Sequence, residues 1–539
     1  MQNSYYKSLV YFTFGLILFS FYCSLKIGLG VDENYHHING ALRYLYLEKL
    51  GNFDDFNWKN NRYYPGLYDT IHYALSKLLD LFIDIKHVVK IKHTINFLFS
   101  SLGILGLFYV NNKLFNKEVA IISCILTLLN PTFFGHMGMN PKDPIVFFAI
   151  VWTIYFFILY LENLESHRLK YLILMCIFLG FGTGIRLTFA ALILPLAIIW
   201  IYTLVKKKIK ISSIALDLFY GLTIIFFLTF VTWPHIHNGN YDLILEVLKK
   251  SSSWLIPFKH GIVNGNFYEI QNTPRTHIIS IFLSKMPIYF IILILFSFLI
   301  IFLKKNFFIE KINSNFFVYF ILLNTVLFFP ILTMIITKTN LYDNVRLFLF
   351  TIPFFATLAS FGFFFIISNF KQAKLIFRSF SILIIILIIL SFYRFALLTP
   401  YQYVYLNFFT SPIFHKSINK FEHDYWYTSY GELINKIKEK YGEIEASKLN
   451  IRTCDSFRDG HRYYFNQILK NEQALPENAD YVILTNRVLR LRKMNCFELF
   501  KGEDILKVER LGMTLSSFKK IQPRQEEKEY MTSEWLKNH

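Results

Sequence analysis

Long apolar segments recur along the first three quarters of the chain and constrain its fold more than any other feature. A helix of about 20 apolar residues is long enough to cross a bilayer, and the run 382–390 contains no polar side chain at all. The sequence therefore predicts an all-α polytopic membrane protein. We expect eleven spans, at about 9–25, 94–110, 119–134, 144–160, 171–184, 187–204, 214–232, 287–303, 316–336, 348–367 and 380–393.

Basic residues are concentrated in the short turns between these spans. The net charge of +19 suggests nucleic-acid binding at first sight, but short cytoplasmic turns of membrane proteins carry the same excess of Lys and Arg. Placing Lys7 inside puts the turns after spans two, four, six, eight and ten inside as well. Those turns hold fourteen basic residues, at positions 113, 117, 168, 170, 206, 207, 208, 210, 304, 305, 311, 371, 374 and 378. We therefore expect membrane-lipid contacts and no nucleic-acid partner.

The same assignment places the long polar segments outside the cytoplasm. They are the loops 28–92 and 233–285 and the tail 399–539, which follows a membrane domain of residues 1–398. Within the loops we expect short helices at 69–81 and 241–250. In the tail, a helix at 429–441 and strands at 450–453, 481–484 and 505–511 predict a small α/β domain. Cys454 and Cys496 lie in this domain, and a disulfide between them is left open.

Asp32 and Glu33 stand directly after the first span and are the candidate catalytic pair. Without ATP or nucleotide sugars outside the cytoplasm, glycosyl transfer there must use a sugar on a polyprenyl phosphate. Such a site needs a carboxylate to accept the proton of the acceptor hydroxyl and cations to hold the departing phosphate. The competing interpretation is that both residues only cap a helix, because acidic groups favour helix N-termini.

A second group of polar residues is expected beside this pair. Lys142 and Asp143 stand between spans three and four, and His36 would share a helix face with Asp32. We expect these three in the acceptor or donor pocket. Asp143 before Pro144 is also typical of a helix start, and an interfacial histidine is commonly a structural hydrogen-bonding group.

Arg186, Arg346 and Arg275 are the candidate ligands of the lipid phosphate. Each lies at the predicted outer face, where a guanidinium pairs with an anion or extends to the interface. Ordinary lipid headgroups would bind such arginines equally well. No Cys/His cluster has metal-ligand spacing, whereas a divalent cation, Mg²⁺ or Mn²⁺, on Asp32, Glu33 or Asp143 is left open.

Four stretches together resemble the GT-C superfamily of membrane glycosyltransferases. They are the pair Asp32-Glu33, residues 140–144 (NPKDP), residues 341–350 (LYDNVRLFLF) and residues 424–430 (DYWYTSY). The set is similar to bacterial relatives of the dolichyl-phosphate-mannose protein mannosyltransferases, glycosyltransferase family 39. The resemblance implies a GT-C fold, a polyprenyl-phosphate sugar donor, inversion at the anomeric carbon and Asp32 as the base. Eukaryotic members carry a large β-trefoil domain between spans seven and eight, where this chain has about fifty residues.

Because that domain is missing, the acceptor is left open between a protein and an envelope glycan or lipid. Lys, Ile, Asn and Phe are abundant, which suggests an AT-rich bacterial genome. We therefore expect a bacterial inner-membrane protein whose site and tail face the periplasm. Two other classes remain as alternatives: a transporter or flippase of lipid-linked glycans, and a non-catalytic envelope assembly factor.

Overall fold

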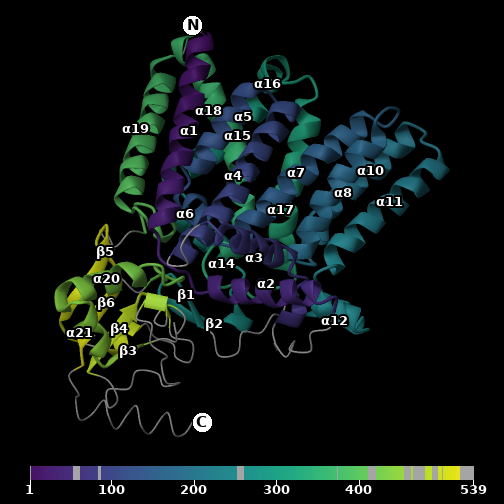
Figure 1. Cartoon of the computed structure of the whole chain (residues 1–539). Helices are drawn as coiled ribbons and strands as arrows, with labels where there is room; N and C mark the ends of the chain where they lie inside the picture. Colours follow the sequence, from purple (N-terminus) through teal and green to yellow (C-terminus); the bar gives the residue numbers. More distant parts are fainter. Residues whose placement is uncertain are drawn as a thin grey trace.

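The chain is described by a computed structural model in which a bundle of long helices carries a smaller C-terminal domain at one end (Figure 1). The structure describes residues 2–51, 61–82, 87–251, 260–372, 374–410, 420–454, 460, 463–464, 480–488, 496–500 and 502–521.

Eight helices of the described chain are long and apolar enough to cross a membrane. They are α1 (Gln2–Lys26), α4 (Val88–Leu114), α7 (Asp143–Glu162), α8 (Arg168–Ile185), α11 (Ile211–Phe230), α17 (Phe316–Ile336), α18 (Ile352–Asn369) with its preceding 3-10 turn η4 (Arg346–Thr351), and α19 (Leu375–Leu397). Two bent pairs raise the number to ten: α5 (Lys117–Leu128) with α6 (Pro131–Met139), bent by 74°, and α14 (His277–Lys285) with α15 (Ile288–Leu303), bent by 114°.

Each of the eleven predicted spans therefore falls on a helix or a bent pair, and the polytopic helical fold is confirmed. The span expected at 187–204 is the exception in length. It is divided between α9 (Phe189–Leu192) and α10 (Leu194–Lys206), with Pro195 at the start of α10. Proline lacks a backbone N–H and is tolerated only in the first turn of a helix, so α9 and α10 do not merge.

Burial divides the bundle into a central layer and a lipid-facing layer. In α18, 89% of the apolar span is buried inside the protein, against 17% in α19 and 22% in α1. A helix that exposes apolar side chains over most of its surface is stable only in lipid. The chain is thus an integral multi-pass membrane protein, with α18 near its centre and α1 and α19 at its surface.

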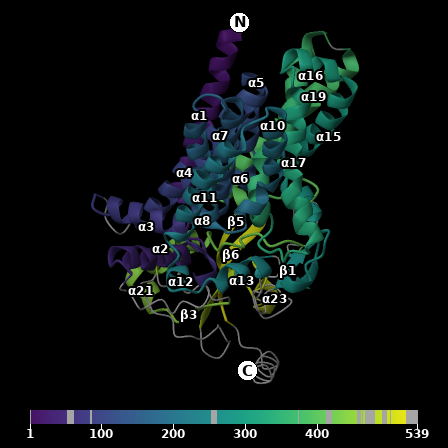
Figure 2. The same ribbon diagram turned by 90° about the vertical axis from the view of Figure 1, so that its right-hand side faces the viewer.

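Short elements gather at one end of the bundle, which we call the distal end (Figure 2). They are α2 (Glu33–Glu48), η1 (Asn61–Tyr63), α3 (Leu67–Leu79), α12 (Pro234–His237), α13 (Asp242–Lys250), β1 (His260–Val263), β2 (Asn266–Glu269) and η3 (Ile270–Asn272). The helices expected at 69–81 and 241–250 are confirmed as α3 and α13. The antiparallel β1–β2 hairpin was not predicted. The basic turn at α16 (Lys305–Lys311) lies at the opposite end, near the N-terminus (Figure 1).

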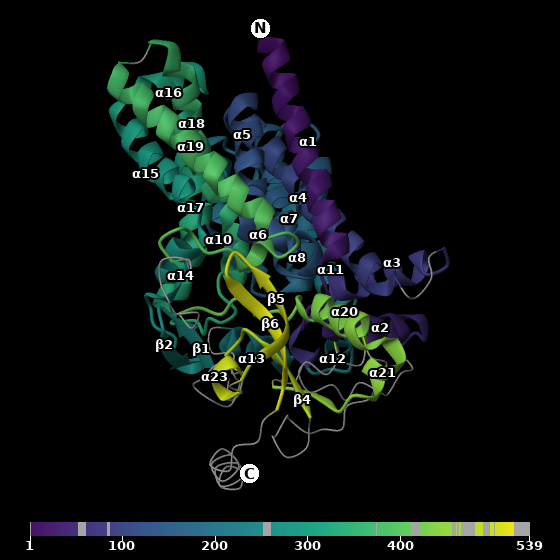
Figure 3. The same ribbon diagram turned by 90° about the vertical axis from the view of Figure 1, so that its left-hand side faces the viewer.

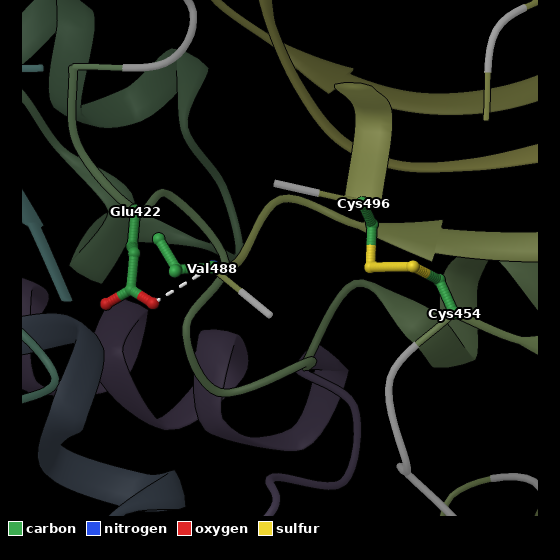
Figure 4. Close-up of a disulfide and its surroundings, with 4 residues drawn as sticks. All are labelled: Glu422, Cys454, Val488 and Cys496. Atoms are coloured by element: carbon green, nitrogen blue, oxygen red, sulfur yellow. Dashed lines mark hydrogen bonds between the residues drawn. A yellow bond between two sulfur atoms is a disulfide. The ribbon is translucent and has the colours of Figure 1, made fainter. Parts of the chain in front are cut away.

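The C-terminal domain is a four-stranded mixed sheet with helices beside it (Figure 3). Its elements are η6 (Gln402–Val404), α20 (Tyr430–Tyr441), α21 (Glu443–Lys448), β3 (Ile451–Thr453), β4 (Tyr481–Thr485), α23 (Cys496–Leu499), β5 (Asp504–Arg510) and β6 (Met513–Lys520). The strand order is β3-β4-β6-β5, and only the β3–β4 pair is parallel. The predicted helix and three strands are confirmed, whereas β6 was missed. A disulfide joins Cys454 to Cys496 (Figure 4).

The C-terminal domain packs on the bundle through η6, which is held in place by hydrogen bonds within the tail. The Asp424 carboxylate accepts hydrogen bonds from the backbone N–H groups of Thr428 and Ser429, each at 3.0 Å, and from the Tyr403 hydroxyl. Burial raises the pKa of Asp424, although these hydrogen bonds act in the opposite direction. Tyr403 belongs to η6, which packs on α6 of the bundle. The tail is therefore positioned against the distal end from its first residues onward.

Candidate active site

Arg346 is the centre of a charged cluster at the distal end. Each of its three guanidinium nitrogens pairs with a different carboxylate: Nη2 lies 2.6 Å from Asp32, Nε lies 3.1 Å from Asp143 and Nη1 lies 3.0 Å from Asp343. Asp343 and Asn344 adopt positive φ angles, which turn the chain sharply just before η4. Arg346 thereby connects the start of α2, the start of α7 and the entry to α18.

Two further arginines complete what we call the ionic cluster. Arg186 Nη2 lies 2.5 Å from Asp143, and Arg487 Nη2 lies 3.3 Å from Asp343. The cluster comprises Asp32, Asp143, Arg186, Asp343, Arg346 and Arg487. Its three positive and three negative groups alternate, and such pairing makes buried charges tolerable. Four of these residues were predicted site residues from separate parts of the sequence, and the structure brings them together.

Asp32 differs from the other two carboxylates of the cluster in its exposure. Its side chain is 30% exposed, compared with 1% for Asp143 and 3% for Asp343. Asp32 does occupy the N-cap position of α2, but its side chain makes no capping hydrogen bond. The carboxylate is directed to Arg346, so helix capping does not account for this residue.

The Glu33 carboxylate lies elsewhere, because successive helix residues are rotated by about 100° around the axis. It is buried, 2.9 Å from His93 Nε2 on α4, and accepts a hydrogen bond of 2.6 Å from the backbone N–H of Gly30. Glu33 thus connects α1, α2 and α4, and among the described residues it forms no ion pair with the ionic cluster. The predicted acidic pair is divided between two environments.

His36 stands one turn after Asp32 on α2 and faces a buried polar group. Its Nδ1 lies 3.1 Å from both oxygens of Asp69 on α3, and Asn39 also donates to that carboxylate. Burial alone would raise the pKa of Asp69, but His36, Lys142 and Asn39 outweigh burial and lower it. These contacts fix α2 against α3.

Lys142 is a buried cation close to the ionic cluster. Its Nζ lies 3.4 Å from the centre of the Tyr64 ring, a cation–π arrangement. Burial and the positive charge of Arg186 lower the pKa of Lys142 to about 7, although Asp69 and Asp143 act in the opposite direction. Lys142 can therefore gain or lose a proton near neutral pH.

One aromatic ring from the tail and one from the segment before η4 lie beside Arg346. Its guanidinium carbon lies 4.8 Å from the centre of the Trp426 ring and 6.0 Å from that of Tyr342. Arg487 donates to the backbone carbonyl of Tyr425 at 2.8 Å. Trp426 lies within residues 424–430, one of the four stretches that resemble the GT-C superfamily, so the sequence did point to this residue. Arg487 follows the strand β4 in a segment with no recognisable motif, and the sequence offered no signal.

Arg275 is the predicted site residue that lies apart from the others. It is exposed in the turn before α14 and forms no ion pair with any described residue. The proposed metal ligands do not converge either, since Arg346 holds Asp32 and Asp143 while His93 holds Glu33. Across the described parts of the chain, no three His, Cys, Asp or Glu side chains are arranged to hold a metal ion.

Comparison with known proteins identifies the class of fold. Residues 78–233 match the family model described as dolichyl-phosphate-mannose-protein mannosyltransferase. ArnT from Cupriavidus metallidurans bound to undecaprenyl phosphate superposes with a TM-score of 0.51 at 10% identity, covering 94% of this chain and 97% of that one. Its apo state gives the same TM-score and identity, with 95% and 98% covered. No match is found among curated protein sequences.

The chain therefore has the GT-C fold of membrane glycosyltransferases, as its sequence motifs indicated. Over nearly its whole length the chain resembles ArnT, a protein whose structure has been solved with undecaprenyl phosphate. The match at 10% identity is a match of fold.

Proposed function

We propose that this chain transfers a sugar from a polyprenyl-phosphate carrier to an acceptor hydroxyl, with Asp32 as the general base. The proposal rests on the exposure of Asp32, since the other two carboxylates of the ionic cluster are buried. A general base must reach the proton that it removes, and only Asp32 of the three clustered aspartates is open to an entering molecule. The GT-C fold supports the same chemistry.

Arg186 and Lys142 are the residues that we assign to the phosphate of the donor. Arg186 uses one nitrogen for Asp143, and its side chain is 22% exposed, which leaves donors for an incoming phosphate. In Arg346, by contrast, all three guanidinium nitrogens already pair with carboxylates. We therefore assign Arg346 to positioning Asp32 rather than to direct phosphate binding, and we assign no phosphate contact to the distant Arg275.

The reaction then proceeds by displacement at the anomeric carbon. Asp32 accepts the proton of the acceptor hydroxyl, whose oxygen forms the new bond to that carbon. The bond between the anomeric carbon and the phosphate oxygen breaks, and the polyprenyl phosphate departs with the electron pair toward Lys142 and Arg186. Attack and departure on opposite sides of the carbon invert its configuration. No step is routed through a metal ion.

The donor lipid places the reaction at the membrane surface, and we propose the periplasmic face of a bacterial inner membrane. The Cys454–Cys496 disulfide supports this side, since disulfides persist in oxidising compartments and are rare in the cytosol. The acceptor is a protein hydroxyl or an envelope glycan or lipid, and a hexose such as mannose is the sugar that the family match suggests.

The decisive experiment compares Asp32→Asn with the wild-type protein. Purified chains in detergent receive radiolabelled polyprenyl-phosphate hexose and a crude envelope extract, and release of sugar from the lipid is measured. Because a general base contributes roughly 10²- to 10⁴-fold to a rate, we expect a loss of that size. Glu48→Gln is the matched control, since Glu48 ends the same helix and, among the described residues, forms an ion pair only with exposed Lys77.

Equal turnover by Asp32→Asn and Glu48→Gln would rule out Asp32 as the base. If neither the wild type nor the variants release sugar, although the wild type binds the labelled lipid, the donor is a polyprenyl phosphate that carries a different sugar. An Asp32→Asn chain that fully complements a deletion strain would instead favour a non-catalytic assembly role.

A further inference from the structure

A second pocket opens at the distal end, separate from the ionic cluster. It has a volume of about 480 Å³ and lies between the end of α1, the start of α4, the segment after α19, and the elements α20 and β5 of the tail. Its wall includes Tyr22, Lys26, Lys90, Tyr401, Glu432 and Arg510. The membrane domain and the tail therefore build this pocket together.

The pocket carries uncompensated positive charge. Arg510 Nη2 lies 2.7 Å from Glu432, and the Tyr401 hydroxyl donates to the same carboxylate at 3.0 Å. The lysines are different: Lys26 and Lys90 are exposed, and neither pairs with a carboxylate in the described part of the chain. Lys26 lies only over the ring of Tyr22, 5.9 Å from its centre. Two cations thus remain available to an anion that enters the pocket.

The position of the pocket relative to the membrane indicates what kind of anion it receives. Lys26 ends α1, whose exposed apolar residues include Phe14, Leu18 and Tyr22, and Lys90 lies in the first turn of α4. Lysine and tyrosine at the end of a membrane helix mark the headgroup region of the bilayer. The two lysines therefore stand at headgroup depth.

An apolar surface leads to the pocket from the membrane interior. Helices α1 and α19 meet near their distal ends, where the ring centres of Phe19 and Phe395 are 6.0 Å apart. On α19, Ile382, Ile386, Ile389 and Leu390 are all exposed. A hydrocarbon chain lying along α1 and α19 would bring its headgroup to the pocket.

We propose that this pocket binds the phosphate group of an anionic phospholipid in the same leaflet, with Lys26 and Lys90 as the phosphate ligands. The lipid chains lie along α1 and α19, and the remainder of the headgroup contacts Tyr401 and the tail. Gly28 lines the pocket and stands four residues before Asp32, so the two sites are at most about 14 Å apart along the chain. The pocket can therefore hold a phospholipid beside the site of transfer.

The test measures equilibrium binding of radiolabelled phosphatidylglycerol to the purified full-length protein in detergent. Each basic residue near a charged membrane surface strengthens binding, and two lysines together correspond to roughly 30-fold in affinity. We expect the double variant Lys26→Gln/Lys90→Gln to lose about that factor. The matched control Lys304→Gln/Lys305→Gln removes two exposed lysines from the opposite end and should bind normally. Lys26→Arg/Lys90→Arg should retain binding.

Three outcomes would overturn the proposal. Equal affinities of the two glutamine variants would show that Lys26 and Lys90 are not phosphate ligands. Equal binding of phosphatidylcholine and phosphatidylglycerol by the wild type would show that net negative charge is not recognised. Complete competition by millimolar inorganic phosphate would show a site for the free anion rather than for a lipid. The readout is binding, so it is independent of whether Asp32 catalyses sugar transfer.

Discussion

At the scale of single residues, the most consequential side chain is Arg346. Three carboxylates from distant parts of the sequence share its guanidinium, and two of them are almost fully buried. An arginine can do this because its planar group presents five donors in fixed directions, whereas lysine offers a single point charge. The negative charges of this region are thus stable only as a set.

Replacing Arg346 by Met should therefore destabilise the protein strongly. Removing one partner of a buried ion pair costs about 3–5 kcal/mol, since the other charge is left unpaired. We expect a clearly lower melting temperature in detergent. The exposed Arg275→Met serves as the control, because surface substitutions change stability by about 0.5 kcal/mol or less.

Adding Asp32→Asn to Arg346→Met should restore part of the lost stability, because Asp143 and Asp343 still pair with Arg186 and Arg487, whereas Asp32 has lost the arginine that it faces. Melting temperatures that are the same for Arg346→Met and Arg275→Met would contradict the shared-cation interpretation of the cluster.

Lys142 gives the site a dependence on pH that can be measured separately. Its pKa of about 7 means that the free protein loses this charge as the pH rises through neutrality. Phosphate binding favours the protonated amine, so binding above pH 7 requires the uptake of a proton. We expect the Kd for the donor to be constant below pH 7 and to rise by up to about tenfold per pH unit above it.

The Lys142→Arg variant keeps its charge at all accessible pH values and should show a flat profile. A wild-type Kd that does not change between pH 6 and pH 9 would remove Lys142 from the phosphate site.

At the scale of elements, two neighbouring acidic residues at the start of α2 point to different environments and make different contacts. Asp32 faces the ionic cluster, and Glu33 connects α2 to His93 of α4 and to the backbone of Gly30. Glu33 was predicted to be catalytic with Asp32. Its buried, fully engaged carboxylate leads us to propose a positioning role instead.

The variant Glu33→Gln distinguishes these roles. Glutamine keeps an oxygen to accept from Gly30 and an amide that can bond His93, so we expect turnover within a few-fold of wild type and a lower melting temperature. The loss of a charged hydrogen bond of this kind costs about 1.5–3 kcal/mol. A loss of turnover as large as that of Asp32→Asn, at unchanged stability, would restore Glu33 to the catalytic pair.

At the scale of the whole molecule, the structure places the polar loops and the tail at one end and the lysine-rich turn at α16 at the other (Figure 1). The side of the membrane can be tested by single cysteines. The native cysteines give no background, because Cys23, Cys124 and Cys176 are buried and the other two form the disulfide. Lys440→Cys probes the tail and Lys304→Cys probes the opposite end.

In intact cells, we expect a membrane-impermeant maleimide that crosses the outer membrane to label Lys440→Cys and not Lys304→Cys. Permeabilised cells should label both. Labelling of Lys304→Cys alone in intact cells would reverse the proposed orientation.

Much of the architecture could be predicted because apolar length and turn charge are local properties of the sequence. The same topology placed Asp32, Asp143, Arg186 and Arg346 on one face, and the structure brings them into contact. Arg487 could not be predicted, because its contact with Asp343 depends on how the tail packs on the bundle. The direction of Glu33 was available from helix geometry, since adjacent residues cannot face one point.

The contact between Asp343 and Arg487 also has a consequence for how the protein is made. Ribosomes add about 5–20 residues per second, and 455 residues separate Asp32 from Arg487. Roughly 20 to 90 seconds therefore pass between the synthesis of Asp32 and the synthesis of Arg487. A nascent chain that stalls inside the tail would already be inserted in the membrane with its charges unbalanced. The ionic cluster is therefore completed only after synthesis has passed Arg487 in the tail.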